Sequence, residues 1–437
     1  MQWSKKVFLI LVVSIHALYF IGSIVLKTYM NQDSVEYLAQ AHNMVYHGSF
    51  YAANWDVWPH NFSFYSLRPP MYGLLVLVTA EVSSNVYVLL FVQSVLSIFI
   101  WVKLRHFVLQ FVPAVNESRL HLYLVLALLL NPIQLVLCNS VFSDILFQFF
   151  ISLSFFSLLN FIYFKKSNYF LYYTMYIVFA LFTKPAFVYY AYFNILFAWY
   201  VYFKLKRSWT VIACSFILPL FIIMVSVINK RVTGYYHFSS SKVENLWTYN
   251  TTNFLNLKYG HDSGYTYKKE IWLQSKLQPD FEHQYQFLDS ACTHVLMQNI
   301  VSYTWYHSQG VLNFFVAPGR EFVNSYLDQD EAQPKSFIKE LNVNGWKGVK
   351  NYFTSQPLSL FLLNVLVVLW NLFVLLGLCF FVFSKRIPLP LKISALILLL
   401  YIAGISSMAM GTARYKVAIY PVLLFCSTYF LGTKREA

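Results

Sequence analysis

Five charged residues flank apolar segments of this sequence, and their side chains suit a reaction at a phosphate group. They are Asp33, Arg68, Asp144, Lys184 and Arg414. Cations bind phosphate through charge-assisted hydrogen bonds, and a carboxylate can accept a proton from a hydroxyl or an amine. A charge next to an apolar run is costly wherever that run is buried, so each residue needs a partner or a role. As a set they predict two carboxylates and three cations that converge on one surface.

Asp33 opens a helical pattern. Val35 and Leu38 lie at helical spacing and Gly48 can end the helix, which predicts an amphipathic helix on a membrane surface. One interpretation makes Asp33 the N-cap, with Glu36 completing a capping box. The other makes Asp33 a base or a ligand at that surface. The two are compatible, because a capping carboxylate keeps one free oxygen.

Arg68 precedes Pro69 and Pro70, which keep it out of the helix that follows. An arginine here suits a lipid phosphate, which a guanidinium can bind through two parallel hydrogen bonds. The alternative is an anchor whose charged end reaches the headgroups. Lys184, just before Pro185 and between two apolar runs, has the same two interpretations.

Asp144 and Arg414 begin two further apolar runs. Asp144 is either the N-cap of its helix or a carboxylate of the site, and it is the fallback base if Asp33 is only a cap. Arg414 is followed by Lys416, so two cations lie directly outside the last apolar run. Because this opposes the usual placement of cations on the inner side, the pair predicts an anion to bind.

The composition defines the surroundings of these residues. Of 437 residues, 58% are hydrophobic and only 11% are charged, whereas a soluble domain carries about 25% charged residues. Most of the surface therefore faces lipid, and the chain is an integral membrane protein. The five cysteines form no CxxC pair, so neither a zinc ribbon nor a disulfide framework is indicated.

Ten apolar segments are long enough to be membrane crossings, each needing about 20 residues or somewhat fewer at a functional break. The predicted spans are 7–26, 85–102, 120–138, 144–163, 169–183, 185–203, 209–228, 358–383, 392–410 and 417–432. The shorter apolar run from Met71 to Ala80 predicts a re-entrant or interfacial helix.

Lysine and arginine set the orientation. With both termini inside, the inner segments hold 15 cations and two acids, and the outer ones hold 17 cations and 16 acids. The formal net charge of +14 is thus almost wholly a positive-inside bias, and it indicates no nucleic-acid partner. The domain prediction is a transmembrane module 1–228 with an external loop 27–84, an external subdomain 229–356, and C-terminal spans 357–437.

The residues in this order resemble the GT-C superfamily of integral-membrane glycosyltransferases. They are most similar to the branch that holds aminoarabinose lipid A transferases and protein O-mannosyltransferases. The matching features are the Asp33 helix, the Arg68-Pro-Pro-x-Tyr72 motif, Asp144 at the start of a span, Lys184-Pro185, and Arg414-Tyr415 followed by a proline. The resemblance covers about residues 5–230 and 390–432. It implies a GT-C-like bundle of about ten transmembrane helices, with interfacial helices in the first external loop and a small external subdomain.

The resemblance implies an inverting transfer from a polyprenyl-phosphate-linked sugar to a lipid, glycan or protein acceptor. In such enzymes the first-loop aspartate, here Asp33, activates or positions the acceptor. The cations, here Arg68, Lys184 and Arg414, hold the donor phosphate. Glu36, Tyr72 and Tyr415 would support them. The expected location is a bacterial inner membrane, with cytoplasmic termini and an external active site.

Two departures from the family pattern bear on metal and substrate. Leu67 stands where lipid A transferases place a metal-binding acid, which argues against a bound divalent metal, and no other cofactor is indicated. Ser34 replaces a second acid that is common in the mannosyl branch. Two other functions remain open: a transporter or flippase of lipid-linked intermediates, which would place charges near mid-span, and a non-catalytic membrane scaffold.

Overall fold

The computed structural model describes residues 4–260, 262–328, 337–355, 357–407 and 413–432. Every regular element in these ranges is helical, and none is a strand. Seven of the described helices are long and apolar enough to cross a bilayer, and a bent pair of helices makes an eighth candidate. The prediction of an all-α polytopic membrane protein is therefore confirmed.

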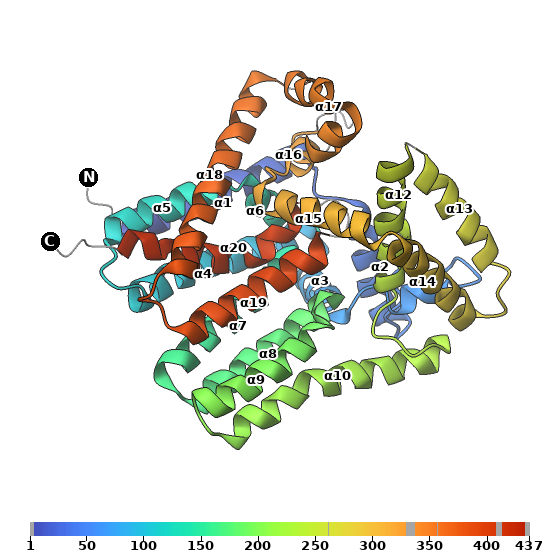
Figure 1. Ribbon diagram of the computed structural model, residues 1–437, viewed down its shortest axis with the longest axis horizontal. Helices are drawn as coiled ribbons and strands as arrows, with labels where there is room; N and C mark the ends of the chain where they lie inside the picture. Colours follow the sequence, from blue (N-terminus) through green and yellow to red (C-terminus); the bar gives the residue numbers. More distant parts are fainter. Residues whose placement is uncertain (1–3, 261, 329–336, 356, 408–412, 433–437) are drawn as a thin grey trace.

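The apolar helices form a bundle in which most run side by side (Figure 1). Their bounds are α1 Lys5–Leu26, α4 Val86–Phe111, α5 Glu117–Leu129, α6 Pro132–Cys138, α7 Asp144–Phe164, α8 Ser167–Thr183, α9 Tyr190–Lys204, α10 Trp209–Thr233, α18 Leu358–Phe383, α19 Leu389–Ser406 and α20 Ala413–Ser427. A short 3-10 helix, η4 (Thr428–Gly432), extends α20, and another, η2 (Pro185–Phe187), precedes α9.

The ten predicted spans each have a helical counterpart, but not all ten are full crossings. The predicted spans 169–183 and 185–203 correspond to α8 and α9, which have 17 and 15 residues. Both are shorter than the roughly 20 residues that cross a bilayer unaided. The predicted span 392–410 corresponds to α19, and its last residues, 408–410, lie outside the described ranges.

The predicted span 120–138 is wrong as a single helix. It consists of α5 and α6, which meet at an angle of 66°. Pro132 at the first position of α6 lacks a backbone N–H and disfavours a helical conformation at Asn131, so the helix breaks between the two residues. The signal for this break, an Asn-Pro pair, was present in the sequence.

The segment between α1 and α4 contains two shorter helices, α2 (Gln32–Tyr46) and α3 (Pro70–Val82), with a 3-10 turn, η1 (Phe62–Tyr65), between them. Gly48 has a φ of +60° two residues after the end of α2, a conformation that glycine adopts without strain. The two helices pack on each other through Tyr37 and Tyr72, whose ring centroids lie 4.6 Å apart.

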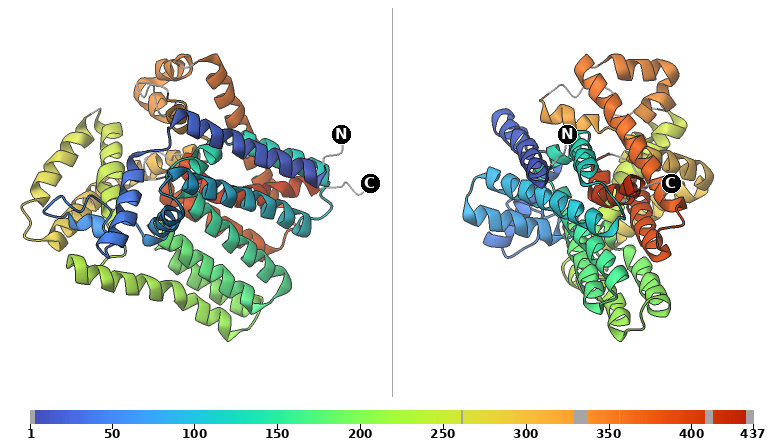
Figure 2. Two further views of the ribbon diagram at one scale, coloured as in Figure 1. Left: turned by 180° about the vertical axis from the view of Figure 1, so that it is seen from behind. Right: turned by 90° about the vertical axis from the view of Figure 1, so that its left-hand side faces the viewer.

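The long segment after α10 is helical as well. Its elements are α11 Ser241–Asn245, a π-helical segment η3 Leu246–Thr251, α12 Thr252–Tyr259, α13 Ser263–Ser275, α14 Phe281–Gln298, α15 Ile300–Val316, α16 Arg320–Tyr326 and α17 Phe337–Thr354. Figures 1 and 2 show α12, α13 and α14 as a lobe at the end of the bundle far from the two chain ends. By contrast, α15 packs on α20 and α16 packs on α6. The predicted domain boundaries stay a prediction.

The two most buried spans are α7 and α20. In each, 78% of the apolar window is buried, against 22% in α1. They pack directly on each other, with Phe155 of α7 against Phe425 of α20. These two helices therefore form the centre of the bundle. α7 begins at Asp144, and Arg414 is the second residue of α20; the sequence analysis singled out both residues.

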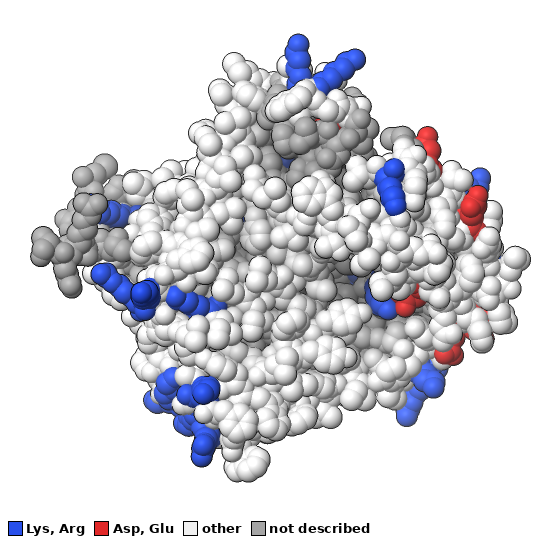
Figure 3. All heavy atoms as spheres, in the orientation of Figure 1, with Lys and Arg blue, Asp and Glu red and all other residues white. Residues whose placement is uncertain are grey.

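The charged surface is asymmetric (Figure 3). On the face that Figure 3 shows, cations gather at the end where α1 begins and at the α9–α10 turn, whereas both signs lie over the α12–α14 lobe. This asymmetry matches the distribution that the sequence predicts. The assignment of the lobe to the external side stays a prediction.

Candidate active site

Six charged side chains of alternating sign form one continuous series of ion pairs, called here the ion chain. It contains three acids and three bases from separate parts of the sequence. Its order is Glu36, Arg68, Asp33, Arg414, Asp144 and Lys184. The structure thus brings together all five residues that were predicted to share a surface, and adds Glu36.

The exposed half of the ion chain consists of Glu36, Arg68 and Asp33, and Arg68 lies at its centre. Its Nη2 donates to Asp33 Oδ1 at 2.8 Å and its Nε donates to Glu36 Oε2 at 2.5 Å. Asp33 and Glu36 lie one turn apart in α2, and the extended residues before α3 carry Arg68 across to them. The three side chains are between 20% and 24% exposed, so solvent and a ligand can reach them.

The buried half of the ion chain consists of Arg414, Asp144 and Lys184, and Asp144 lies at its centre. Its Oδ1 accepts from Lys184 Nζ at 2.7 Å and its Oδ2 accepts from Arg414 Nε at 3.0 Å. Arg414 also donates through Nη2 to Asp33 Oδ2 at 2.8 Å, which joins the two halves. The Asp144 side chain is 2% exposed, so this carboxylate is fully removed from solvent.

The interpretation of Asp33 as an N-cap is wrong. The N-cap of α2 is Asn31, whose backbone N–H donates to Ser34 Oγ at 2.9 Å. Asp33 lies in the first turn, and both of its oxygens accept from guanidinium groups. The helix is capped two residues earlier than the sequence analysis assumed, so the Asp33 carboxylate is not needed for capping.

Asp144 is likewise not an N-cap. Ser143 precedes α7 and Asp144 is its first residue. A carboxylate in the first turn is stabilised by the free N–H groups and the dipole of the helix, which here adds to two ion pairs. The N-terminus of α7 therefore adds a favourable interaction to the two ion pairs of this buried carboxylate.

Aromatic rings support the cations. The Phe142 ring centroid lies 3.9 Å from Arg414 Cζ, and the Tyr37 centroid lies 5.0 Å from Arg68 Cζ. Tyr415 lies 5.2 Å from Lys184 Nζ. Such contacts hold a planar guanidinium in place while leaving its edge free for an anion. Tyr37 and Phe142 were missed in the sequence because an aromatic residue in an apolar run carries no signal of its own.

Two of the predicted supporting residues contact the ion chain differently. Tyr415 faces Lys184, as described above, whereas Tyr72 makes no ion-chain contact that the structure records. Its hydroxyl donates to Gln93 Oε1 at 2.8 Å, and its ring packs edge-on against Tyr37. Tyr72 therefore supports the ring beneath Arg68.

Lys416 pairs with backbone carbonyls at the end of α15. It lies within α20, and its Nζ donates to the carbonyls of Phe315 at 3.1 Å and Ala317 at 3.3 Å. These are carbonyls at the C-terminus of α15, where a cation is favourable. The prediction that an anion binds both Arg414 and Lys416 stays a prediction.

The pKa values of Asp33 and Glu36, the two acids in the exposed half of the ion chain, are shifted in opposite directions. Burial alone would raise the pKa of Asp33, but Arg414 and Arg68 outweigh it and hold that pKa well below the ordinary value. For Glu36, burial dominates and raises the pKa, with Arg68 offsetting only part of the effect. Burial also raises the pKa of Glu244 in α11, which interacts with Glu36 and Arg68. Asp33 is thus firmly ionised, and Glu244 is a further acid on this side of the site.

The acids of the ion chain already have cationic partners. The carboxylates of Asp33 and Asp144 each accept from two cations, and Glu36 accepts from Arg68. No group of three His, Cys, Asp or Glu side chains suited to a metal occurs among the described residues.

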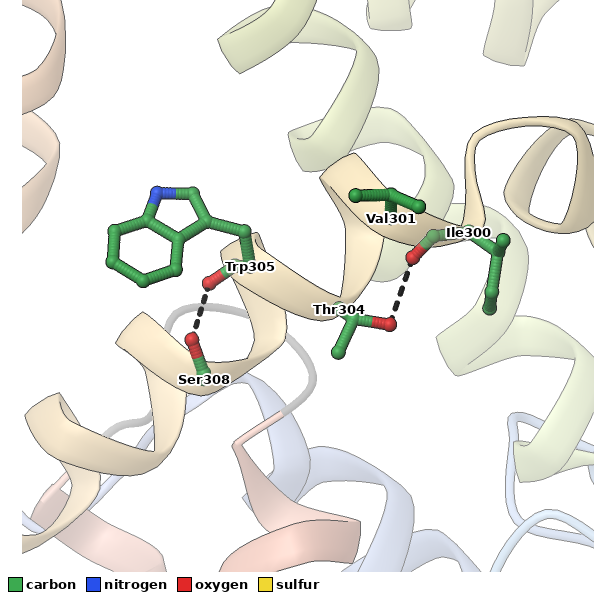
Figure 4. Close-up of a pocket in the computed structure, with 5 residues that line it drawn as sticks. All are labelled: Ile300, Val301, Thr304, Trp305 and Ser308. Carbon is green, nitrogen blue, oxygen red and sulfur yellow. Dashed lines mark hydrogen bonds between the residues drawn. The ribbon is translucent and has the colours of Figure 1, made fainter.

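A separate hollow of about 410 Å³ lies on α15, lined by Ile300, Val301, Thr304, Trp305 and Ser308 (Figure 4). Its two hydroxyls donate to carbonyls of the same helix, Thr304 to Ile300 and Ser308 to Trp305. The hollow therefore offers an apolar surface and contains no member of the ion chain.

The fold and the site define a polytopic, all-helical membrane protein with a paired-charge network at the ends of its central spans. No protein-family model and no curated protein matches the chain. In overall structure it is similar to ArnT from Cupriavidus metallidurans bound to undecaprenyl phosphate. That match covers 98% of this chain and 78% of ArnT, at 12% identity and a TM-score of 0.41.

The apo state of the same ArnT matches over 97% of this chain and 77% of ArnT, at 11% identity and a TM-score of 0.38. A likeness of this degree assigns no residue, so the functional argument rests on the ion chain.

Proposed function

We propose that the protein is an inverting membrane glycosyltransferase that moves a sugar from a polyprenyl-phosphate donor to a lipid, glycan or protein acceptor. The ion chain is the observation that carries this proposal. A scaffold has no need for three buried or half-buried cations at one place, and a transporter would be expected to place charges near mid-span. The lipid in the solved ArnT structure, undecaprenyl phosphate, belongs to the proposed class of donor lipid.

The donor phosphate would bind by exchange. In the ion chain every cation is neutralised by a carboxylate, so an arriving phosphate must take the place of a carboxylate at Arg68 or Arg414. Asp33 is the carboxylate to be displaced, because it is more exposed than Asp144 and is shared between the two arginines. Phosphate binding would thus release one oxygen of Asp33 beside the reacting centre.

The same exchange would prepare Asp33 as a base. The paired arginines hold its pKa low, and losing one of them to the phosphate raises its affinity for a proton. In the transfer step the acceptor oxygen or nitrogen bonds to the anomeric carbon, and the carbon–oxygen bond to the phosphate breaks. The acceptor proton goes to Asp33, and the sugar inverts because the attack comes from the side opposite the phosphate.

The cations would stabilise the leaving group. The donor is a phosphodiester, and the polyprenyl phosphate that leaves carries additional negative charge. Arg68, Arg414 and Lys184 lie in one network. Their N–H groups are already in position, so they can stabilise the negative charge that develops on the phosphate as it leaves. In this proposal the site faces the external side of a bacterial inner membrane, and both termini are cytoplasmic.

The test compares membranes from cells that express the wild-type protein and the Asp33→Asn variant at equal levels. Mass spectrometry of lipids, glycans and proteins should find a sugar-sized mass addition that depends on the wild-type protein and is absent with the variant. The polyprenyl-phosphate-linked sugar should accumulate with the variant. Identical products and identical donor levels in the two membranes would contradict the proposal.

A further inference from the structure

A proline in the middle of α20 leaves one backbone carbonyl without its usual donor. Pro421 has no N–H, so the carbonyl of Val417, four residues earlier, receives no helical hydrogen bond from it. In a buried apolar place an unpaired carbonyl is costly. Gln148 of α7 supplies the missing donor, with its Nε2 lying 2.6 Å from Val417 O.

Gln148 is itself held in place by a second glutamine. Gln134 of α6 and Gln148 exchange two hydrogen bonds, each from Nε2 to Oε1 at 2.7 Å. The remaining N–H of Gln134 reaches Ser97 Oγ of α4 at 2.9 Å. The two glutamine side chains are at most 1% exposed. Each amide nitrogen therefore uses both of its donors, and Gln148 is oriented toward Val417.

This bond lies next to the ion chain. Gln148 is four residues after Asp144, on the same face of α7, and Val417 is three residues after Arg414 in α20. Val417 and Phe142 belong to one apolar cluster between α6, α7 and α20, and the Phe142 ring packs on Arg414. A displacement of α20 along α7 would thus change the Arg414–Asp144 distance directly.

We propose that Gln148 is a positioning residue, which ties α20 to α7 so that Arg414 stays at hydrogen-bond distance from Asp144 and in reach of the donor phosphate. The part that concerns the phosphate rests on the function proposed above. Gln148 acts on Arg414 through the backbone of α20, by its hydrogen bond to Val417 O. Pro421 makes the tie possible, because a regular helix would have used the Val417 carbonyl internally.

The substitution Pro421→Ala distinguishes two roles of Gln148: tying α20 to α7, and pairing the free carbonyl of Val417. An alanine at position 421 restores an N–H that can donate to Val417 O within α20. In the double variant Gln148→Met and Pro421→Ala, the carbonyl is paired again, but α7 and α20 are no longer tied. Methionine has the length of glutamine without its donors, so the packing volume changes little.

The experiment measures the melting temperature and the affinity for undecaprenyl phosphate of purified protein in detergent. Gln148→Met should lower the melting temperature and weaken lipid binding at least tenfold. The double variant should recover much of the melting temperature while keeping the tenfold loss of binding. If the double variant recovers both together, Gln148 only satisfies a carbonyl, and the proposal is overturned. Wild-type affinity in Gln148→Met overturns it as well.

Ser97→Ala is the matched control. It removes the hydroxyl that accepts from Gln134 and that also pairs with His16 of α1, and it leaves the bond from Gln148 to Val417 in place. It should lower the melting temperature and leave lipid affinity within twofold of wild type. A tenfold loss of affinity in Ser97→Ala would show that general loosening explains the effect, and would overturn the assignment to Gln148.

A third measurement keeps the two proposals separate. If the wild-type protein binds no undecaprenyl phosphate, the proposed function fails, but the tie is still measured by a double-mutant cycle of Asp144→Asn and Arg414→Gln. The stability coupling between these two residues should fall by at least half in the Gln148→Met background. An unchanged coupling overturns the positioning role independently of any lipid.

Discussion

Asp33 and Asp144 belong to helices far apart in the chain, yet one guanidinium joins them: Arg414 donates to Asp33 at 2.8 Å and to Asp144 at 3.0 Å. The Asp144 side chain is 2% exposed and also pairs with Lys184, whereas the Asp33 side chain is 24% exposed and also pairs with Arg68. The shared arginine thus connects a buried, structural acid to an accessible one. This division of roles is the basis of the predictions below.

The first prediction concerns stability. Arg414→Ala leaves Asp144 buried with Lys184 as its remaining ion-pair partner, and removing one member of a buried pair costs about 3–5 kcal/mol. Arg68→Ala acts at the more exposed end and should cost about 1–2 kcal/mol, between the values for exposed and buried pairs. Denaturation of the two purified variants in detergent measures the difference. A larger loss for Arg68→Ala would contradict the assignment of the buried end.

The second prediction concerns the base. Asp33→Asn should fold normally, because Asn31 caps α2, and it should still bind the lipid donor. Sugar transfer should fall at least a hundredfold, since a general base contributes about 10²–10⁴ and asparagine cannot accept the proton. Single-turnover transfer kinetics provide the measurement.

The matched control for the base is Glu36→Gln, one turn away in the same helix and paired with the same arginine. It should reduce transfer less than tenfold. If Asp33→Asn retains wild-type transfer while Asp144→Asn loses it, the base is Asp144. Asp144→Asn needs its own stability measurement, because that carboxylate supports two buried cations.

The third prediction concerns pH. The raised pKa of Glu36 means that the folded state binds this proton more tightly than the unfolded state, so stability should fall as pH rises above about 4.5. The lowered pKa of Asp33 has the opposite effect, and its contribution should be lost only as pH falls below about 3.8.

Melting temperatures measured between pH 4 and 7 test the contribution of Glu36. Glu36→Gln should flatten the dependence above pH 4.5, because glutamine does not titrate. An unchanged slope in this variant would show that the dependence comes from another group.

The fourth prediction concerns orientation. Thr266 in α13 and Asn168 at the start of α8 are both exposed, at opposite ends of the bundle. In a background with the exposed Cys379 replaced, a membrane-impermeant thiol reagent should label Thr266→Cys in intact cells and should leave Asn168→Cys unlabelled. The reverse pattern would invert the membrane orientation and place the ion chain on the cytoplasmic side.

The sequence was sufficient to predict the membrane class and the members of the ion chain. Charges are rare in apolar sequence, so Asp33, Arg68, Asp144, Lys184 and Arg414 were conspicuous. Their pairing was not predictable, because ion pairs between distant residues depend on how helices pack. The helix caps were misassigned for a related reason. Asn31, Asp33 and Ser143 are all residue types that favour the N-cap position, but the structure has Asn31 and Ser143 at the N-caps and Asp33 and Asp144 in ion pairs.

The polar contacts within the bundle were also beyond sequence reasoning. Gln134 and Gln148 lie in apolar runs, where a lone glutamine gives no indication of its partner. Pro421 did mark an interruption in α20, but the carbonyl it frees becomes informative only when the neighbouring helix is seen. Sequence patterns predicted the helices and the charged residues of the site, whereas the polar contacts between helices depend on how the helices pack.

The most direct test of the central claim, that the ion chain binds a lipid phosphate, is a comparison of two lipids that differ only in that group. Native mass spectrometry of the purified protein should show undecaprenyl phosphate bound at least tenfold more tightly than undecaprenol. Charge-assisted contacts contribute about 1.5–3 kcal/mol each, so Arg68→Ala should weaken binding of the phosphate about ten- to a hundredfold and leave the alcohol unaffected. Equal affinity for the two lipids, or equal affinity of wild type and Arg68→Ala for the phosphate, would contradict the claim.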